Sequence, residues 1–502
     1  MIEKYFAQIM QGENERAALS GLRVEIKDEN IFETVKKRIG DGGSLVLLLS
    51  SLDAKVRKNA AALLGDLEIK EAAQALYDAW KKEEKLFIRG TMLKALGQTN
   101  PYPYLSELKE YYEDLCRREV SSEEKKHVRE ELHALEEILR QEGEEVRHTF
   151  IGWDQRHKIL LTANPKYAFV TAEQFSAFRK KTTSLGVLAI VDNLREIAKI
   201  RTYRELLFPI RLERPVSLYD GPEAFGEALA DSKLIFFLER CHREPAPFYF
   251  RIDIKGGLSL EERSRYTKRA AAVIEEKSER KLINAPKDYE FEVRLILDAE
   301  SGIHVFLKMF TFSMDRFAYR KASIATSMHP SLAAMLFELA RPYLKEKAQI
   351  LDPCCGAGTM LVERHKALPA REIYGIDIFG EAVAKARVNT EAAGMRVNFI
   401  LKDYMEFRHD YLFDEIISNL PMRGKRSKEE HDLFYREFFD QSEQLLSSDG
   451  IMILYTNEAG FVKKQIRLHP VFRLRKEYLI REKDGFWLFV IEMSEYKNKS
   501  RN

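Results

Sequence analysis

Four short apolar runs between residues 348 and 421 each end in a polar side chain. The end residues are Asp352, Asp377, Asp403 and Asn419. If the runs are strands of one parallel sheet, their carboxyl ends meet on one rim, which is where open α/β sheets bind their ligands. The spacing therefore predicts a ligand site built from the ends of four strands.

The turn after the first run would supply backbone contacts for such a ligand. It contains Gly356 and Gly358 and leads into a predicted helix over residues 360–366. Glycine lets the backbone approach a ligand where a Cβ would collide, and the N–H groups at a helix N-terminus favour an anionic ligand group. Asp377 follows the glycines by about 20 residues, where a carboxylate can accept both hydroxyl protons of a ribose.

These residues together resemble the class I methyltransferase fold, and specifically its amino-methylating branch. A glycine turn alone also occurs in nucleotide-binding sites, so the resemblance depends on the later strand ends. It implies that Asp352, Gly356 and Gly358 wrap the methionine part of the cofactor S-adenosyl-L-methionine. It further implies that Asp377 binds the ribose and that Asp403 faces the adenine amine.

The same resemblance places Phe379 where an apolar side chain stacks on the adenine. Residues 325–335 resemble the segment before the first strand of THUMP methyltransferases, so Ser327 and His329 are expected at the cofactor's carboxylate or the substrate. Capping of the helix that begins at Pro330 is the alternative role for both. The candidate cofactor-binding residues are Ser327, His329, Asp352, Cys354, Gly356, Gly358, Thr359, Asp377, Ile378, Phe379, Asp403, Tyr404 and Asn419.

The last strand end supplies the candidate catalytic residues Asn419, Leu420, Pro421 and Met422. The Asn419 side-chain oxygen and the Leu420 carbonyl could accept both N–H groups of an exocyclic amine and align its nitrogen with a methyl donor. Pro421 stiffens the loop. The family pattern has an aromatic residue and a glycine where this chain has Met422 and Arg423. This departure leaves open which base is used and whether the domain is fully active.

Two basic segments are candidate RNA contacts. The loop after the catalytic residues carries Arg423, Lys425 and Arg426 on the rim beside the reaction centre. A predicted helix over residues 261–281 carries Arg263, Arg265 and Lys268. The alternative for both segments is an ordinary solvated surface. Two further apolar runs, residues 451–455 and 487–491, are expected to complete the sheet and to be mostly core.

Residues 150–320 read as an α+β module. Apolar runs at residues 158–162, 186–191, 248–254, 289–297 and 302–310 predict strands. The module resembles the THUMP domain and its ferredoxin-like neighbour in RNA methyltransferases, through residues 250–253, 270–275, 284–286 and 291–294. The resemblance implies that it grips the acceptor end of tRNA. Arg316 and Tyr319-Arg320 resemble that family's connection between domains.

Residues 1–145 read as successive helices that end in a charged linker near residues 141–145. The segments beginning at Val56-Arg57 and Ile88-Arg89 repeat with an offset of 32 residues. Repeats of this kind bury their apolar faces by stacking, and the pattern resembles HEAT-like repeats. An ordinary helical bundle is the alternative. Either arrangement predicts an arm that scaffolds or binds a protein partner.

Bulk properties narrow the class of protein. The formal net charge is +2, which excludes a uniformly basic coat and leaves only local nucleic-acid surfaces. The four cysteines show no zinc spacing, so we expect no metal and reduced thiols. The sequence shows neither a signal peptide nor an apolar run of membrane-spanning length. We therefore expect a cytoplasmic protein that does not associate with membranes.

The sequence thus predicts a multidomain fold: an all-α HEAT-like domain over residues 1–145, an α+β THUMP-like domain over 150–320, and an α/β Rossmann-like class I methyltransferase domain over 321–495. The expected activity is methylation of guanine N2 in RNA, with tRNA as the expected partner. The alternatives are guanine N2 in ribosomal RNA, adenine N6, or a degenerate methyltransferase that acts as an RNA-binding scaffold.

Overall fold

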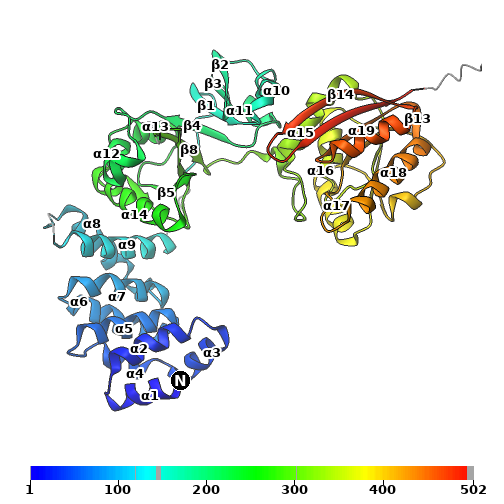
Figure 1. Cartoon of the computed structure of the whole chain (residues 1–502). Helices are drawn as coiled ribbons and strands as arrows, with labels where there is room; N and C mark the ends of the chain where they lie inside the picture. Colours follow the sequence, from blue (N-terminus) through cyan, green and yellow to red (C-terminus); the bar gives the residue numbers. More distant parts are fainter. Residues whose placement is uncertain (1, 119, 122, 143–147, 301, 495–502) are drawn as a thin grey trace, which may run out of the picture. The chain divides into compact units, whose positions relative to one another are not determined.

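A computed structural model of the 502-residue chain describes residues 2–118, 120–121, 123–142, 148–300 and 302–494 (Figure 1). The chain divides into two compact units, Met1–Arg147 and His148–Asn502. Residues 143–145 of the expected linker lie outside the described residues. No helix in the described ranges is both long and apolar enough to cross a lipid bilayer.

The first unit is helical, which confirms the all-α prediction for this region. Side chains cap the helices that begin at Glu29 and Ala54: Asp28 accepts the N–H groups of Asn30 and Ile31, and Asp53 accepts that of Lys55. The helices are α1 Ile2–Gln11, α2 Glu15–Glu25, α3 Glu29–Ile39, α4 Gly43–Leu48, α5 Ala54–Asp66, α6 Ala73–Lys82, α7 Leu86–Gln98, α8 Leu105–Arg117 and α9 Lys125–Glu142.

The 32-residue repeat corresponds to a repeated structural detail. Helices α5 and α7 are offset by the same 32 residues and pack on each other. Arg57 donates to the Ser51 carbonyl (2.8 Å) and to the buried carboxylate of Glu83 (2.7 Å). Arg89 likewise donates to the Trp80 carbonyl (3.0 Å) and, through Nε, to the Glu131 carboxylate (2.8 Å). Each arginine ties its helix to the preceding turn; the assignment to HEAT-like repeats stays a prediction.

An eight-stranded sheet opens the second unit, in the order β2-β3-β1-β4-β8-β7-β5-β6. Neighbouring strands are antiparallel except that β5 runs parallel to β6 and β7. The strands are β1 His157–Thr162, β2 Arg179–Thr183, β3 Gly186–Val191, β4 Leu206–Ile210, β5 Phe248–Lys255, β6 Leu282–Asn284, β7 Phe291–Leu297 and β8 Ile303–Met309.

The same part of the unit contains the helices α10 Ala168–Ala172, α11 Leu194–Lys199, α12 Gly221–Ala230, α13 Leu234–Cys241 and α14 Leu260–Lys277. All five contribute buried residues to the same apolar core as the strands. The expected strands are present; β2, β4 and β6 are additional. Strand β2 is an exposed, basic edge strand without apolar alternation, and β6 has three residues, so neither gives a strand signal.

A seven-stranded sheet follows, in the order β11-β10-β9-β12-β13-β15-β14. Its first five strands in this order are parallel, and β15 is antiparallel to both β13 and β14. This confirms the α/β prediction for the C-terminal region. The strands are β9 Gln349–Asp352, β10 Glu372–Asp377, β11 Asn398–Leu401, β12 Phe413–Asn419, β13 Leu446–Thr456, β14 Phe472–Arg481 and β15 Phe486–Met493.

Helices cover both faces of this sheet. Alternate residues such as Ile350 and Leu351 of β9 point to opposite faces and belong to different cores. Helices α15 and α16 cover one face, and α18 and α19 cover the other. The helices are α15 Pro330–Ala340, α16 Thr359–Ala367, α17 Gly380–Ala392, α18 Lys428–Leu445 and α19 Ala459–Leu468.

A buried ion pair fixes α16 to β12. Arg364 and Glu415 are both fully buried, and the guanidinium meets the carboxylate through two hydrogen bonds of 2.6 and 2.7 Å. Both charged groups lose their hydration when such a pair forms, which costs free energy. Removal of one partner, however, leaves a buried charge without its counter-charge.

We expect Glu415→Gln to destabilise α16 and β12 by about 3–5 kcal/mol, because Arg364 loses its counter-charge. Hydrogen-exchange protection of amides in the two elements measures the loss. The matched control is Glu381→Gln, which breaks the exposed pair between Glu381 and Lys385 and should cost less than about 1 kcal/mol. Equal protection in the two variants would show that the buried pair is not a strong constraint.

Candidate active site at the strand ends

The glycine turn is shaped by left-handed backbone and by Asp377. Gly356 and Gly358 have φ values of 53° and 79°, a region that side chains other than glycine seldom adopt. The Gly356 N–H donates to one Asp377 carboxylate oxygen at 2.9 Å, and the Phe379 N–H donates to the other at 3.0 Å. Asp377 therefore holds the turn against the end of β10.

Asp352 is 1% exposed and lies beneath the turn. Its Oδ1 accepts hydrogen bonds from the Cys354 N–H (3.1 Å) and the Ser418 hydroxyl (3.0 Å), whereas its Oδ2 has no partner among the described residues. Burial, opposed by those two hydrogen bonds and reinforced by Asp377, raises the pKa of the Asp352 carboxyl to about 7. Asp352 thus joins the end of β9 to β12.

The residues after β10 and β11 present apolar and acidic groups. Ile378 and Phe379 are exposed, Phe379 to 66%, although they are large apolar side chains. Asp403 is exposed and caps the short helical turn Tyr404–Glu406. The Tyr404 hydroxyl is paired with Ser442 at 2.9 Å in the core, so only the ring of Tyr404 is available to a ligand.

His329 has the helix-capping role that was its alternative, whereas Ser327 bonds to the backbone before the helix. The Ser327 hydroxyl accepts the Ile324 N–H at 2.9 Å, and His329 Nδ1 accepts the Ser331 N–H at the start of α15. Burial and nearby arginines, Arg204 first among them, lower the pKa of His329 to about 4, so its ring is neutral at physiological pH. Both residues still line the cavity described next.

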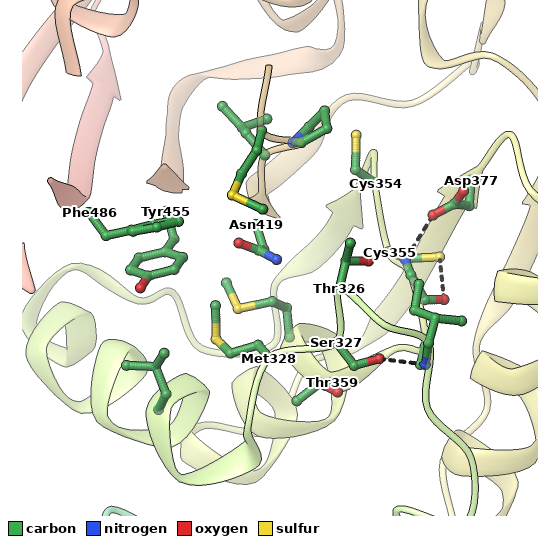
Figure 2. A pocket seen from close by; sticks show the side chains of 18 of the residues that line it. Thr326, Ser327, Met328, Cys354, Cys355, Thr359, Asp377, Asn419, Tyr455 and Phe486 are labelled. Carbon is green, nitrogen blue, oxygen red and sulfur yellow. Dashed lines mark hydrogen bonds between the residues drawn. The ribbon is translucent and has the colours of Figure 1, made fainter. Parts of the chain in front are cut away.

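One large cavity, of about 1270 Å³, brings the strand ends together (Figure 2). The predicted cofactor and catalytic residues that line it are Ser327, His329, Cys354, Gly356, Thr359, Asp377, Ile378, Phe379, Asp403, Tyr404, Asn419, Leu420, Pro421 and Met422. Asp352 and Gly358 are not part of its lining.

Asn419 stands at the end of β12 with its side chain available. The Leu420 N–H donates to the Tyr455 carbonyl at 3.0 Å, which fixes the backbone just after Asn419. No described residue forms a hydrogen bond with the Asn419 amide group, and Asn419 borders the cavity. Met422, 55% exposed, also faces this space. A free amide oxygen beside a ligand cavity can accept an N–H group.

The predicted RNA-contact residues divide into two groups. Arg426 lines the cavity and lies over the Phe434 ring at 5.3 Å, whereas Arg423 and Lys425 are exposed on the same loop outside the lining. Arg263, Arg265 and Lys268 lie on α14 and do not line the cavity. Their contact with RNA stays a prediction.

Several lining residues were not predicted from the sequence. Arg204 and Asn164 come from the first sheet's part of the unit, and Arg481, Tyr455 and Phe486 come from β14, β13 and β15. Tyr455 belongs to a run that was expected to be mostly core, and Phe486 directly precedes the other such run; both side chains are buried, but they also border the cavity. A signal was available, because each aromatic residue lies near the cavity end of its strand.

Comparisons with known proteins agree with this site. Residues 318–483 match the family described as the RMKL-like methyltransferase domain. The chain is 30% identical over 118 residues to the U6 snRNA (guanine-N(2))-methyltransferase THUMPD2 of Bos taurus, which covers 23% of each chain. It is 33% identical over 112 residues to ribosomal RNA small subunit methyltransferase C of Shewanella loihica, which covers 22% of this chain and 32% of the relative.

The chain spans about a quarter to a third of the length of these curated relatives. Two solved structures share the fold over about two thirds of the chain. TrmN from Thermus thermophilus has a TM-score of 0.50 and 19% identity, and the match covers 67% of this chain and 99% of TrmN. SMU.472, complexed with SAH, has a TM-score of 0.52 and 17% identity, and the match covers 68% of this chain and 99% of SMU.472. These two likenesses show the fold; the family match identifies residues 318–483 as a methyltransferase domain, and S-adenosylmethionine is the cofactor of that chemistry.

The cavity fits that cofactor. The positive φ values of the turn favour glycine, which leaves its backbone without side chains at the cavity. The buried Thr359 hydroxyl has no partner among the described residues. Ile378 and Phe379 offer exposed apolar surface for a base. No cluster of three or more metal-ligating side chains occurs among the described residues. The bound cofactor supplies an electrophilic methyl group on a sulfonium sulfur.

Asp377→Ala should weaken the binding of S-adenosylmethionine by about 10- to 100-fold, because a charged acceptor is lost and the Gly356 N–H is released. Isothermal titration calorimetry measures the dissociation constant. Asp410→Ala, a change at an exposed acid outside the cavity, is the control and should bind normally. Unchanged affinity in Asp377→Ala would exclude this carboxylate from the cofactor site.

Asp352 makes the stability of the cofactor-free protein depend on pH. Its folded pKa, about 7, is above the ordinary value of 3.8, so folding disfavours the ionised carboxyl. The resulting penalty is absent below the unfolded pKa, grows as the pH rises from about 4 to 7, and is complete above that range. Asp352→Asn should remove it, with a gain of roughly 2–4 kcal/mol at pH 8.

Thermal unfolding at pH 5, 6.5 and 8 tests this dependence. The stabilisation by Asp352→Asn should be largest at pH 8 and small at pH 5. A difference between wild type and variant that does not change with pH would contradict it.

Proposed function

We propose that this protein is an S-adenosylmethionine-dependent RNA methyltransferase that methylates an exocyclic base amine, most specifically guanine N2 in tRNA. The observation that carries the proposal is the free Asn419 amide at the end of β12, in the cavity that also contains the glycine turn. An exocyclic amine is a poor nucleophile because its lone pair is delocalised into the ring, so the chain must position it.

The chain's own groups can perform that positioning. The Asn419 side-chain oxygen and the Leu420 carbonyl would each accept an N–H of the amine and favour the positive charge that develops as its nitrogen forms a bond to carbon. The proton leaves after methyl transfer, to Asn419 or to water. No strong general base is therefore required. Pro421 limits the freedom of the loop that carries the acceptors.

RNA as the substrate is supported by the relatives and by the cavity wall. The two curated relatives are named for methylation of RNA. Arg204 and Arg426 bring cationic groups to the cavity from two segments far apart in the sequence. A base within folded RNA must be exposed or flipped to reach such a cavity, so an appended RNA-binding module is useful.

The finer assignments come from the resemblance to THUMP methyltransferases. The module around the eight-stranded sheet would be the THUMP-like part, with Arg263, Arg265 and Lys268 on the phosphates of tRNA. The helical first unit would be a HEAT-like arm for a protein partner. These assignments make tRNA the preferred substrate over ribosomal RNA.

A second candidate is favoured by Met422 and Arg423, which replace the family's aromatic residue and glycine. It is a degenerate domain that binds cofactor and RNA but transfers no methyl group. A methyl-transfer assay separates the two candidates. Purified protein is incubated with labelled S-adenosylmethionine and total RNA from a strain that lacks the protein, and only an active enzyme transfers label to the RNA. Nucleoside analysis of the labelled RNA then distinguishes guanine N2 from adenine N6, and fractionated RNA distinguishes tRNA from ribosomal RNA.

Asn419→Ala should lower kcat for methyl transfer by about 100- to 1000-fold, because a transition-state acceptor is removed. The dissociation constant of S-adenosylmethionine should stay within about threefold of the wild-type value. A change of that size is the spread expected when the surroundings of a single interaction differ. Asn419→Asp, which keeps an acceptor of the same shape, should retain more activity than Asn419→Ala. Full activity of Asn419→Ala would rule out its role.

A further inference from the structure

We propose that the target nucleobase packs against an aromatic wall formed by Tyr455 and Phe486, which replaces the aromatic side chain that the loop lacks at Met422. The inference rests on the proposed function, because it assigns the part of the same cavity that receives the base. The ligand class is a purine nucleotide with an exocyclic amine, inserted from RNA.

Strand pairing places the wall beside the candidate catalytic residue. Tyr455 is the direct partner of Asn419 in the parallel pairing of β13 with β12. The rings of Tyr455 and Phe486 are stacked, with centroids 5.0 Å apart and planes 21° apart. Both side chains border the cavity. A group held by Asn419 is therefore next to aromatic surface.

The wall and the cofactor turn lie on different sides of Asn419. Figure 2 shows Tyr455 and Phe486 on one side of Asn419, and Cys354, Cys355 and Asp377 on the other. A pocket for one small ligand usually measures about 300–1000 Å³. The cavity of about 1270 Å³ has room for the cofactor and a second, planar ligand.

The Tyr455 hydroxyl gives a further reason to assign a ligand here. Tyr455 is 3% exposed, and its hydroxyl has no hydrogen-bond partner among the described residues. Buried tyrosine hydroxyls normally have a partner, so a polar edge of a bound base would satisfy this one. Burial raises the pKa of Tyr455 to about 12, so the hydroxyl stays protonated and can donate.

Three cationic side chains line the same cavity. Arg481 lies over the Phe486 ring at 4.3 Å, is half exposed and pairs with Asp484 at 3.0 Å, and Arg204 and Arg426 come from other segments. Phosphates adjoining the base can meet these guanidinium groups while the base lies deeper.

Saturation-transfer NMR with guanosine 5′-monophosphate tests the wall without turnover. The full-length protein is first saturated with S-adenosylhomocysteine. Transfer to the base proton H8 is expected in wild type. Phe486→Leu should weaken nucleotide binding by about 5- to 100-fold, because base–aromatic packing is lost. Tyr455→Phe, which removes only the hydroxyl, should weaken it by about 2- to 10-fold.

Phe472→Leu is the matched control. It makes the same change in the β14–β15 hairpin, at a buried phenylalanine outside the cavity lining, and should leave nucleotide binding unchanged. Binding of S-adenosylhomocysteine by each variant reports that the domain is folded. No transfer to the nucleotide in wild type, or equal transfer in Phe486→Leu and Phe472→Leu, would overturn the proposal.

Steady-state kinetics with RNA separates this proposal from the proposed function. If wild type methylates RNA, Phe486→Leu should lower kcat/KM by about 5- to 100-fold, and a value unchanged from wild type would overturn the aromatic wall alone. If wild type binds the nucleotide through Phe486 but methylates no RNA, the wall stands and the proposed enzymatic function fails.

Discussion

The site depends on the reversal of strand order between β9 and β12. Chain connections leave these neighbouring parallel strands in opposite directions, so their carboxyl ends border an open crevice. Side-chain hydrogen bonds reinforce the pairing across the reversal, from the Ser418 hydroxyl to the buried Asp352 carboxyl and from the Gln349 N–H to the Asp414 carboxylate. The fully buried pair of Arg364 and Glu415 secures the next helix to β12. These contacts fix the glycine turn, which follows β9, relative to Asn419, which ends β12.

Helix α16 extends this constraint to the other sheet. The helix begins directly after the glycine turn, and its Glu363 is fully buried. The Glu363 carboxylate accepts hydrogen bonds from Arg201 at 2.8 Å and from the Tyr319 hydroxyl at 2.7 Å. Arg201 precedes Arg204, which lines the cavity. A single carboxylate therefore links the segment that supplies Arg204 to the turn that would cradle the cofactor, so the two walls of the cavity are positioned by one helix.

The sequence was sufficient for the parts of the site that local pattern encodes. Apolar runs with polar ends predicted the position of Asp377 and Asn419, because parallel strands place such ends on one rim. It was not sufficient for Arg204 or Arg481, since each enters the cavity through pairing or packing between segments far apart in the chain. The exposed basic edge strand β2 was missed for a different reason: it buries nothing and so has no apolar period. Ser327 and His329 both line the cavity, but the Ser327 hydroxyl accepts the Ile324 N–H and His329 caps α15, so their contact with a ligand stays a prediction.

The change at Met422 is best understood together with β13 and β15. An aromatic residue on the loop would have to be ordered when the base binds, whereas Tyr455 and Phe486 already stack on the ends of paired strands. Packing a base against a wall held by the sheet costs less conformational entropy than packing it against a mobile loop residue. The loop after Pro421 is then free to carry exposed charge, and it does so with Arg423 and Lys425. If the base packs on Tyr455 and Phe486 as proposed, the loop does not need an aromatic residue, so its absence does not by itself imply loss of activity.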